Sequence, residues 1–243
     1  MIVLFTDYGT HDLYVGQIRA VLAQYAPDVP VIDLLHEVPN FNITSGAHLL
    51  AALVVQFPQE SVFLSVVDPG VGGARKPVVV RADERWYVGP DNGLLSVLAA
   101  RAGDSKAWQI NWRPKELSHC FHGRDLFAPI AGMISNGGLP KDALSESNDL
   151  EVQISTEDLA EIIYIDHYGN AVTGMRASTL PHETKIKLGT HLVGYARVFS
   201  DLPAGRVFWH RNSLGLIEIA VNCGSAAQQL GITVGQPFVF DSP

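Results

Sequence analysis

The chain has 243 residues, of which 47% are apolar, and a formal net charge of −8. This composition can fill a sizeable core, and an acidic chain without a lysine or arginine cluster argues against a nucleic-acid partner. The longest apolar helical run, residues 47–57, is too short for a membrane span, and Met1 leads into a strand-like segment without signal-peptide features. We therefore expect a soluble, cytoplasmic protein that binds no membrane. Cys120 and Cys223 lack disulfide or metal spacing and should stay reduced.

Strand and helix patterns alternate along the first part of the chain. Strands are predicted at residues 1–6, 30–35, 61–67, 78–80, 86–88 and 106–112, and helices after Asp12, after Asn42 or Thr44, after Asn92 and at 126–134, with Asp12 and Asn92 as N-caps. The strands at 78–80 and 86–88 form a hairpin with a polar tip. The alternation indicates a mostly parallel sheet with helices on both faces.

The stretch from Ser61 to Arg75 organises this domain. Its β-branched and aromatic run predicts a central parallel strand buried on both faces. Asp68 follows the strand, and a glycine-rich turn leads to Arg75. Because ligands bind at the carboxyl ends of strands in open α/β sheets, Asp68 and Arg75 are candidate site residues. The alternative is a structural ion pair that braces the turn.

Other polar loops follow predicted strands. Asp7 and Asp12 come after the first strand, although helix capping alone would explain Asp12. Phe41 lies on the loop after the second strand, where an aromatic ring either stacks on a ligand or, more commonly, folds back onto the core. A polar cluster that contains His122 and Asp125 precedes the apolar helix at 126–134.

The pattern changes at the polar segment 143–158, which we interpret as a linker between domains 1–150 and 151–243. Short strands are predicted beyond it at residues 161–165, 171–174, 185–188, 192–199, 206–209, 216–221 and 237–240, with one helix at 225–230. Such a run of strands favours a small, antiparallel or barrel-like domain. Asp166 and Asn170 bound its first hairpin loop, where such residues commonly form turns.

Three kinds of chemistry fit these residues poorly. A divalent metal site built from Asp7, Asp12, Asp68, His122 and Asp125 lacks any recognised metal-ligand spacing, and Arg75 would compete for Asp68. No GxSxG motif marks a serine nucleophile. The glycines after Asp68 are not followed by GK[ST], so they do not form a nucleoside triphosphate loop.

Six segments in order resemble the S-adenosylmethionine hydrolases, also called SAM hydroxide adenosyltransferases, which are related to the fluorinases and chlorinases. They are FTDYGTHDLYVGQI, SVVDPGVGGAR, GPDNGLL, FHGRDLFAPIA, IDHYGNAVT and NSLGLIEIAVN, and the resemblance runs from Met1 to about Leu230. It implies an N-terminal α/β domain joined to a small β-barrel-like domain. It also implies a homotrimer with the substrate between two chains.

The family's reaction is attack of water or hydroxide on the ribose 5′-carbon of S-adenosylmethionine, which yields adenosine and L-methionine. The resemblance implies a catalytic triad of Asp68, Arg75 and His122 and no metal or other cofactor. It further implies that Asp7 holds the ribose hydroxyls, Phe41 lines the pocket, Asp12 and Asp166 meet the methionine ammonium, Asn170 addresses adenine and Ser213 faces the carboxylate. The chain departs from the fluorinases at Leu214, where they carry an arginine for that carboxylate.

Several alternatives stay open at this point. Arg75 is always protonated and can only orient or stabilise the nucleophile, whereas either His122 or Asp68 can take the proton from water. A module that binds S-adenosylmethionine or adenosine without turnover is a second function class. A 5′-halogenating enzyme is a further alternative. The polar triad favours the hydrolase, since binding alone needs no such cluster.

Overall fold

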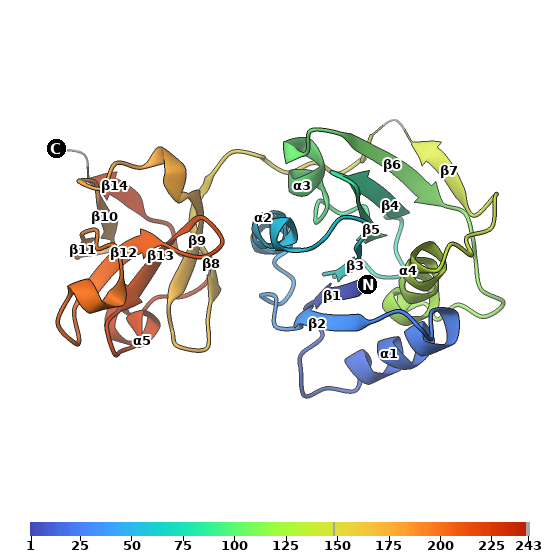
Figure 1. The fold of residues 1–243 in the computed structure, drawn as a ribbon, viewed down its shortest axis with the longest axis horizontal. Coiled ribbons are helices and arrows are strands. Elements are labelled where there is room, and N and C mark those ends of the chain that lie inside the picture. Colours follow the sequence, from blue (N-terminus) through green and yellow to red (C-terminus); the bar gives the residue numbers. More distant parts are fainter. Residues whose placement is uncertain (148, 242–243) are drawn as a thin grey trace. The chain divides into compact units, whose positions relative to one another are not determined.

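The computed structural model describes residues 1–147 and 149–241 and divides the chain into two units, residues 1–156 and 157–243 (Figure 1). The elements of the first unit are β1 (Ile2–Thr6), α1 (Tyr14–Tyr25), β2 (Val31–Leu35), α2 (Ile43–Leu53), β3 (Val62–Val66), β4 (Pro77–Ala82), β5 (Arg85–Pro90), α3 (Ser96–Arg101), β6 (Ser105–Ile110), α4 (Ala128–Ser135) and β7 (Leu144–Ser147). Short 3-10 and π turns occupy Val54–Gln56 and Gly123–Phe127. The alternation of strand and helix predicted for this part of the chain is confirmed.

The first unit is built on one seven-stranded sheet in the order β2-β1-β3-β5-β4-β6-β7. The pairs β1–β2, β1–β3 and β3–β5 are parallel, whereas β4–β5, β4–β6 and β6–β7 are antiparallel. The expectation of a mostly parallel sheet is therefore corrected to a mixed sheet. The predicted hairpin is one cause, because β4 and β5 are joined by a two-residue turn and must run in opposite directions.

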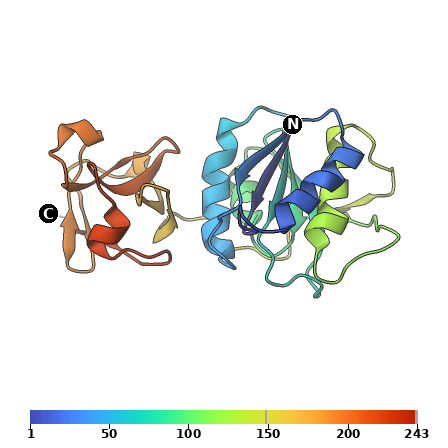
Figure 2. The same ribbon diagram turned by 90° about the horizontal axis from the view of Figure 1, so that it is seen from below.

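The strand β3 lies between β1 and β5, and both neighbours run parallel to it. All of its residues are buried, because helices cover both faces of the sheet. Figure 2 shows α2 on one face and α1 and α4 on the other. The cluster between β1, β3, α1 and α4 is built from large aliphatic side chains such as Leu4, Leu22, Leu64 and Ile130. The central, fully buried parallel strand predicted from the sequence is confirmed.

Local details differ from the expectations at three places. Asp12 is not the N-cap of α1, since Leu13 holds that position and Asp12 Oδ1 accepts from Leu13 N at 2.6 Å. Asn92 lies ahead of α3 and accepts from Leu94 N instead of capping the helix. The segment taken as a linker contributes the edge strand β7 to the sheet. Asn42 does cap α2, as predicted, through Ser45 N at 2.9 Å.

Most of the regular secondary structure of the second unit is β strand. Its elements are β8 (Leu159–Ile165), β9 (Ala171–Arg176), β10 (Lys185–Leu188), β11 (His191–Val193), β12 (Val207–Arg211), β13 (Leu216–Val221), α5 (Ala226–Leu230) and β14 (Val239–Asp241). The strand predicted at 192–199 ends at Val193, and a 3-10 turn follows at Phe199–Asp201. The helix predicted at 225–230 forms with Ser225 as its N-cap.

The strands of the second unit form two antiparallel sheets, ordered β12-β13-β9-β8 and β11-β10-β14. Trp209, Ile186 and Ile219 belong to the buried cluster of this unit. A small antiparallel domain is thus present, while closure into a barrel stays a prediction because the strands pair within two separate sheets. Over residues 1–147 and 149–241, no helix has both the length and the apolar character needed to cross a bilayer.

Candidate active site

The two acids that follow β1 and β3 emerge at the same edge of the sheet. Thr6 and Val66 are paired in the parallel ladder, so the chain leaves both strands side by side at their carboxyl ends. Asp7 follows β1 at once, and Asp68 lies two residues beyond β3. The sheet register therefore brings together two carboxylates from distant parts of the sequence.

The loop after Asp68 folds closely against the segment before α4. Gly72 has a φ of 77° and approaches the backbone carbonyl of His119 so tightly that a Cβ would overlap it. Only glycine meets both conditions without displacing the backbone. This contact holds the loop that carries Asp68 and Arg75 against the segment that carries His122.

Asp68, Arg75 and His122 form one hydrogen-bonded cluster. Arg75 Nε donates to Asp68 Oδ1 at 3.1 Å and to Oδ2 at 3.0 Å, and Arg75 Nη2 donates to Oδ2 as well. Arg75 Nη2 also lies 3.0 Å from His122 Nδ1. The Arg75 guanidinium packs over the ring of Phe127, 5.3 Å from its centroid. The side chains of Arg75 and Asp68 are only 9% and 5% exposed, so this ion pair is largely shielded from solvent.

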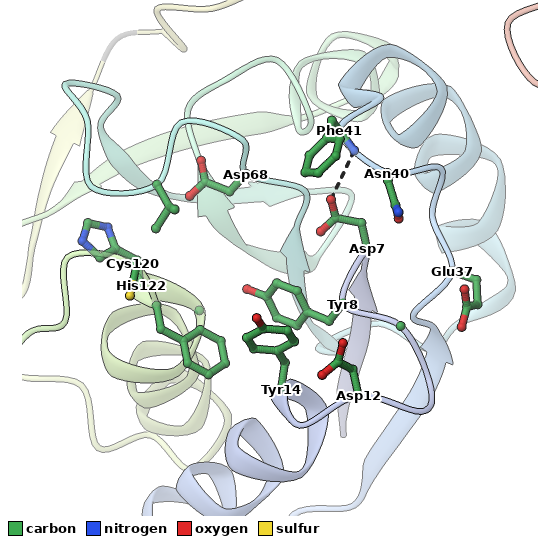
Figure 3. A pocket seen from close by; sticks show the side chains of 14 residues that line it. Asp7, Tyr8, Asp12, Tyr14, Glu37, Asn40, Phe41, Asp68, Cys120 and His122 are labelled. Atoms are coloured by element: carbon green, nitrogen blue, oxygen red, sulfur yellow. Dashed lines mark hydrogen bonds between the residues drawn. The ribbon is translucent and has the colours of Figure 1, made fainter.

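A cavity of about 510 Å³ opens beside this cluster. Figure 3 shows side chains from the ends of β1 and β3, from the loop before α2 and from the segment before α4 around it. Among the predicted site residues, Asp7, Asp12, Phe41, Asp68 and His122 line it. Arg75 reaches it through its contacts with Asp68 and His122.

Sequence reasoning missed several residues that line the same cavity, among them Tyr8, Tyr14, Glu37, Asn40, Val71 and Cys120. The position of Tyr8 next to Asp7 at a strand end was the one available signal. Glu37 has a structural task, because its Oε1 accepts from both Thr10 N at 2.9 Å and Thr10 Oγ1 at 2.8 Å. It thereby anchors the loop between β1 and α1.

Phe41 is held at the mouth of the cavity in a constrained conformation. Its φ is 62°, and its N–H donates to Asp7 Oδ2 at 3.3 Å, as drawn in Figure 3. The side chain is 72% exposed, which excludes the alternative that it folds back onto the core. An exposed aromatic ring in left-handed backbone is uncommon, and it is placed here where it can contact a ligand.

Burial and neighbouring charges shift the pKa values of the titratable groups around the cavity. Burial raises the pKa of Asp7 above its usual value, and the charge of Asp68 adds to this. Burial lowers the pKa of His122, and the adjacent Arg75 guanidinium lowers it further. His122 is therefore neutral near pH 7.

The second unit carries its own cavity of about 750 Å³, lined by the remaining predicted residues Asp166, Asn170 and Ser213. Asp166 Oδ1 accepts from Tyr168 N at 2.9 Å and from Asn170 N at 2.8 Å, so it forms the turn expected from its sequence position. Asp166 Oδ2 accepts from Asn170 Nδ2 at 2.9 Å. This bond leaves Asn170 Oδ1 buried without a partner in the part of the chain that the structure describes.

Sequence reasoning also missed polar groups of this second cavity. His210 Nε2 lies 3.0 Å from Glu218 Oε1, and Asn212 Nδ2 donates to Glu218 Oε2 at 3.0 Å. Arg211 and the 75% exposed Tyr168 also line the cavity. Leu214 does not line this cavity, although its neighbour Ser213 does.

No three histidine, cysteine, aspartate or glutamate side chains are grouped as metal ligands among residues 1–147 and 149–241. Asp125, one of the five ligands considered from the sequence, instead pairs with Arg124 at 2.6 Å and accepts from Ser118 N at 3.0 Å. Asp68 is engaged by Arg75. The cavity of the first unit is thus bordered by an arginine-bound carboxylate and a neutral imidazole.

Both units of the chain are similar to known proteins. Residues 2–144 match the SAM hydroxide adenosyltransferase N-terminal domain, and residues 160–239 match the corresponding C-terminal domain. The (R)-S-adenosyl-L-methionine hydrolases of Salinispora arenicola and Thermus thermophilus are 38% and 35% identical, over 95% and 96% of this chain and 93% and 96% of their own. A fluorinase from Actinopolyspora mzabensis is 24% identical over 97% of this chain and 95% of its own.

A solved structure resembles the chain over its whole length. The crystal structure of an uncharacterised conserved protein from Thermotoga maritima matches with a TM-score of 0.91 and 32% identity, over the full length of both chains. The two matched domains together cover most of residues 2–239, and the hydrolases align over nearly the whole chain. This chain belongs to the SAM hydroxide adenosyltransferase family.

Proposed function

We propose that this protein hydrolyses S-adenosyl-L-methionine at the ribose 5′-carbon, giving adenosine and L-methionine. The observation that carries the proposal is the Asp68–Arg75–His122 cluster beside an acidic cavity at the carboxyl ends of β1 and β3. Relatives named (R)-S-adenosyl-L-methionine hydrolase support both the reaction and the (R) configuration of the substrate sulfonium.

The chemistry suits the charges of the site. The substrate is a sulfonium cation, and carboxylates at Asp7, Asp12 and Asp68 favour its binding. Attack forms the bond between the water oxygen and C5′ and breaks the C5′–S bond, whose electron pair leaves on the neutral thioether of methionine. The charge is lost from the reacting centre in this step, so shielding from bulk water favours it.

The hydrogen bonds support a distinct role for each member of the triad. A guanidinium only donates, so His122 Nδ1 must accept from Arg75 and the imidazole proton must reside on Nε2. His122 Nε2–H can then donate to the attacking water but cannot take its proton. Asp68 is left as the proton acceptor, and the Arg75 charge beside it stabilises the hydroxide-like nucleophile.

The proposed substrate contacts come from the family resemblance, and the two cavities group the residues that would make them. In the first cavity, Asp7 takes the ribose hydroxyls, Asp12 the methionine ammonium, and Phe41 covers the sugar or base. In the second cavity, Asp166 meets the ammonium and Ser213 the carboxylate. Asn170 Oδ1 is a buried acceptor without a partner in the described chain, as a group that binds the adenine amino group would be before ligand arrives.

The proposed residues are divided between two units, so a complete site needs both. We propose a homotrimer in which the first unit of one chain and the second unit of its neighbour enclose one substrate. The family resemblance supports this arrangement, and each unit's separate set of predicted residues is compatible with it. A cytoplasmic location and the lack of a cofactor stay predictions.

Incubation of the purified protein with (R)-S-adenosyl-L-methionine in oxygen-18 water tests the reaction. We expect adenosine with the label in its 5′-hydroxyl and unlabelled methionine, measured by mass spectrometry. Methylthioadenosine, homocysteine or an unlabelled 5′-hydroxyl would contradict the proposal. Tight binding without any product would favour a binding module, and comparison with the (S) epimer tests the stereochemistry.

A further inference from the structure

Tyr8 lines the cavity, and the proposed mechanism of the triad gives it no role. It follows Asp7 at the end of β1, and its ring packs edge-on against Phe121 and tilted against Tyr14, with centroid separations of 5.8 Å in both cases. These ring contacts fix the direction of the phenol. In Figure 3 its hydroxyl end points into the space that Asp68 and His122 also border.

The Tyr8 hydroxyl lies against the backbone directly after His122. A Cβ built on Gly123 would overlap Tyr8 Oη and would lie 3.1 Å from Cζ, so the missing side chain at Gly123 makes room for this oxygen. No hydrogen bond from Tyr8 Oη to any described residue is present, while the backbone N–H of Tyr8 bonds to Thr6 Oγ1 at 3.3 Å. The oxygen is therefore free to bind a molecule in the cavity.

The surrounding charges keep this group a phenol. Burial raises the pKa of Tyr8, and the carboxylates of Asp7 and Asp68 raise it further. Arg75 acts in the opposite direction and does not outweigh them. A neutral phenol both donates and accepts a hydrogen bond, unlike the carboxylates around it.

The nucleophilic water needs one more partner than the triad supplies. A water molecule has two protons and two lone pairs. In the proposed reaction one lone pair faces C5′, the other accepts from His122 Nε2–H, and one proton passes to Asp68. The second proton stays on the product hydroxyl and needs an acceptor that does not remove it, which suits a phenol oxygen.

We propose that Tyr8 is a further catalytic residue of this enzyme, whose hydroxyl accepts a hydrogen bond from the nucleophilic water and orients it together with Asp68 and His122. This inference rests on the proposed hydrolysis. The proposed role of Tyr8 also explains why residue 123 is glycine, because any larger residue there would displace the Tyr8 oxygen. The loop anchor between Glu37 and Thr10 then serves to hold Tyr8 as well as Asp7 in place.

The test is Tyr8→Phe, which removes the hydroxyl and keeps the ring contacts. We expect kcat to fall by about 10 to 100-fold, the scale of a hydrogen bond to a group that becomes charged, with KM changed by less than about twofold. Tyr87→Phe is the matched control, because Tyr87 is a buried tyrosine of the same sheet that does not line this cavity. We expect its kcat to stay within about twofold of the wild type.

Gly123→Ala provides a second, independent variant. The added Cβ displaces the Tyr8 hydroxyl, so kcat should fall in the wild-type background. In the Tyr8→Phe background the same change should cost little more, because the oxygen it displaces is already gone. If the Tyr8→Phe protein does not fold, the single Gly123→Ala variant tests the proposal. An unchanged kcat of the Gly123→Ala protein would then overturn it.

Two further outcomes would overturn it. A Tyr8→Phe enzyme with wild-type kcat would show that the hydroxyl does not act on the water. A higher KM with an intact kcat would show that Tyr8 holds the substrate instead. In both cases the wild-type enzyme still forms adenosine, whereas failure of the wild type to do so would refute the proposed function itself.

Discussion

Nη2 of Arg75 lies 3.0 Å from Nδ1 of His122, so a guanidinium, and not a carboxylate, orients the imidazole. A carboxylate partner would favour the protonated ring and raise its pKa, whereas Arg75 has the opposite effect. His122 is thereby kept neutral with its proton on Nε2. The proposed division of labour, with Asp68 as the base and His122 as a donor, follows from this one contact.

The protonation state of His122 can be measured directly. We expect nitrogen-15 NMR of the imidazole to show the Nε2–H tautomer and a pKa below 6.5. Because only the neutral ring donates through Nε2 to water while Nδ1 accepts from Arg75, activity should fall as the pH drops through this lowered pKa. The Arg75→Gln protein should titrate at a higher pH than the wild type, since a neighbouring positive charge has been removed. A wild-type pKa above 6.5 would contradict the proposed tautomer.

Removal of any member of the triad should act on the chemical step. We expect Asp68→Asn, Arg75→Ala and His122→Ala each to lower kcat by about 100 to 10,000-fold, the usual scale of acid–base help, with a smaller change in KM. Because the three groups act on one water, the Asp68→Asn/His122→Ala double variant should be little worse than the poorer single variant. Steady-state kinetics of adenosine release provides the measurement.

Asp7→Ala serves as the contrast to this series. Its proposed bonds to the ribose are made in the ground state as well, so we expect KM to rise by more than kcat falls. The substitution also frees Phe41 N from its bond with Asp7, which loosens the loop at the cavity mouth. If a substitution of Asp68, Arg75 or His122 weakened binding but left kcat intact, that residue would bind the substrate, as proposed for Asp7, and would not act in the chemical step.

Halide should be a poor nucleophile for this enzyme. The Asp68 carboxylate, paired with Arg75, lies at the proposed position of the nucleophile, and a carboxylate repels an anion. We expect little or no 5′-chloro-5′-deoxyadenosine or the fluoro product, even at high halide concentration. Chromatography of the products resolves these compounds, and halogenated product formed faster than adenosine would reverse the assignment.

If each active site is formed by two chains, two inactive variants with substitutions in different units should regain activity when they are mixed in one oligomer. His122→Ala inactivates the first cavity and Asn170→Ala the second, so each homo-oligomer should have low activity. After dissociation and reassembly of a mixture, we expect partial recovery, because some sites then combine two intact halves. Verified mixed oligomers with no recovery would favour a site formed within one chain.

Much of the fold was predictable from local patterns. The apolar run at residues 62–67 predicted a central strand, because a strand buried on both faces carries apolar residues without alternating polar ones. Asp7 and Asp68 were recognisable as candidates because each follows such a strand. The six ordered motifs identified the family, since their order and spacing are far more specific than any one loop.

The antiparallel pairing of β6 with β4 and β7 was not predictable from the sequence. β7 lies in a polar, acidic stretch and pairs with β6, more than thirty residues earlier in the chain. Burial in the core was one of two alternatives for Phe41 because apolar rings are usually buried, whereas the structure exposes the ring on left-handed backbone whose N–H bonds to Asp7. Both are long-range effects that override local preference.

The sequence by itself determined which chemistry was available: carboxylates at two strand ends, an arginine after a glycine-rich turn and a histidine before a helix. Only the tertiary structure decided how these groups lie relative to one another. Arg75 and His122 are 47 residues apart, and their contact depends on Gly72 letting one loop approach the carbonyl of His119. The same folding sets the Tyr8 hydroxyl against Gly123. Proton positions are set by contacts of a few ångströms between distant segments, which no local pattern encodes.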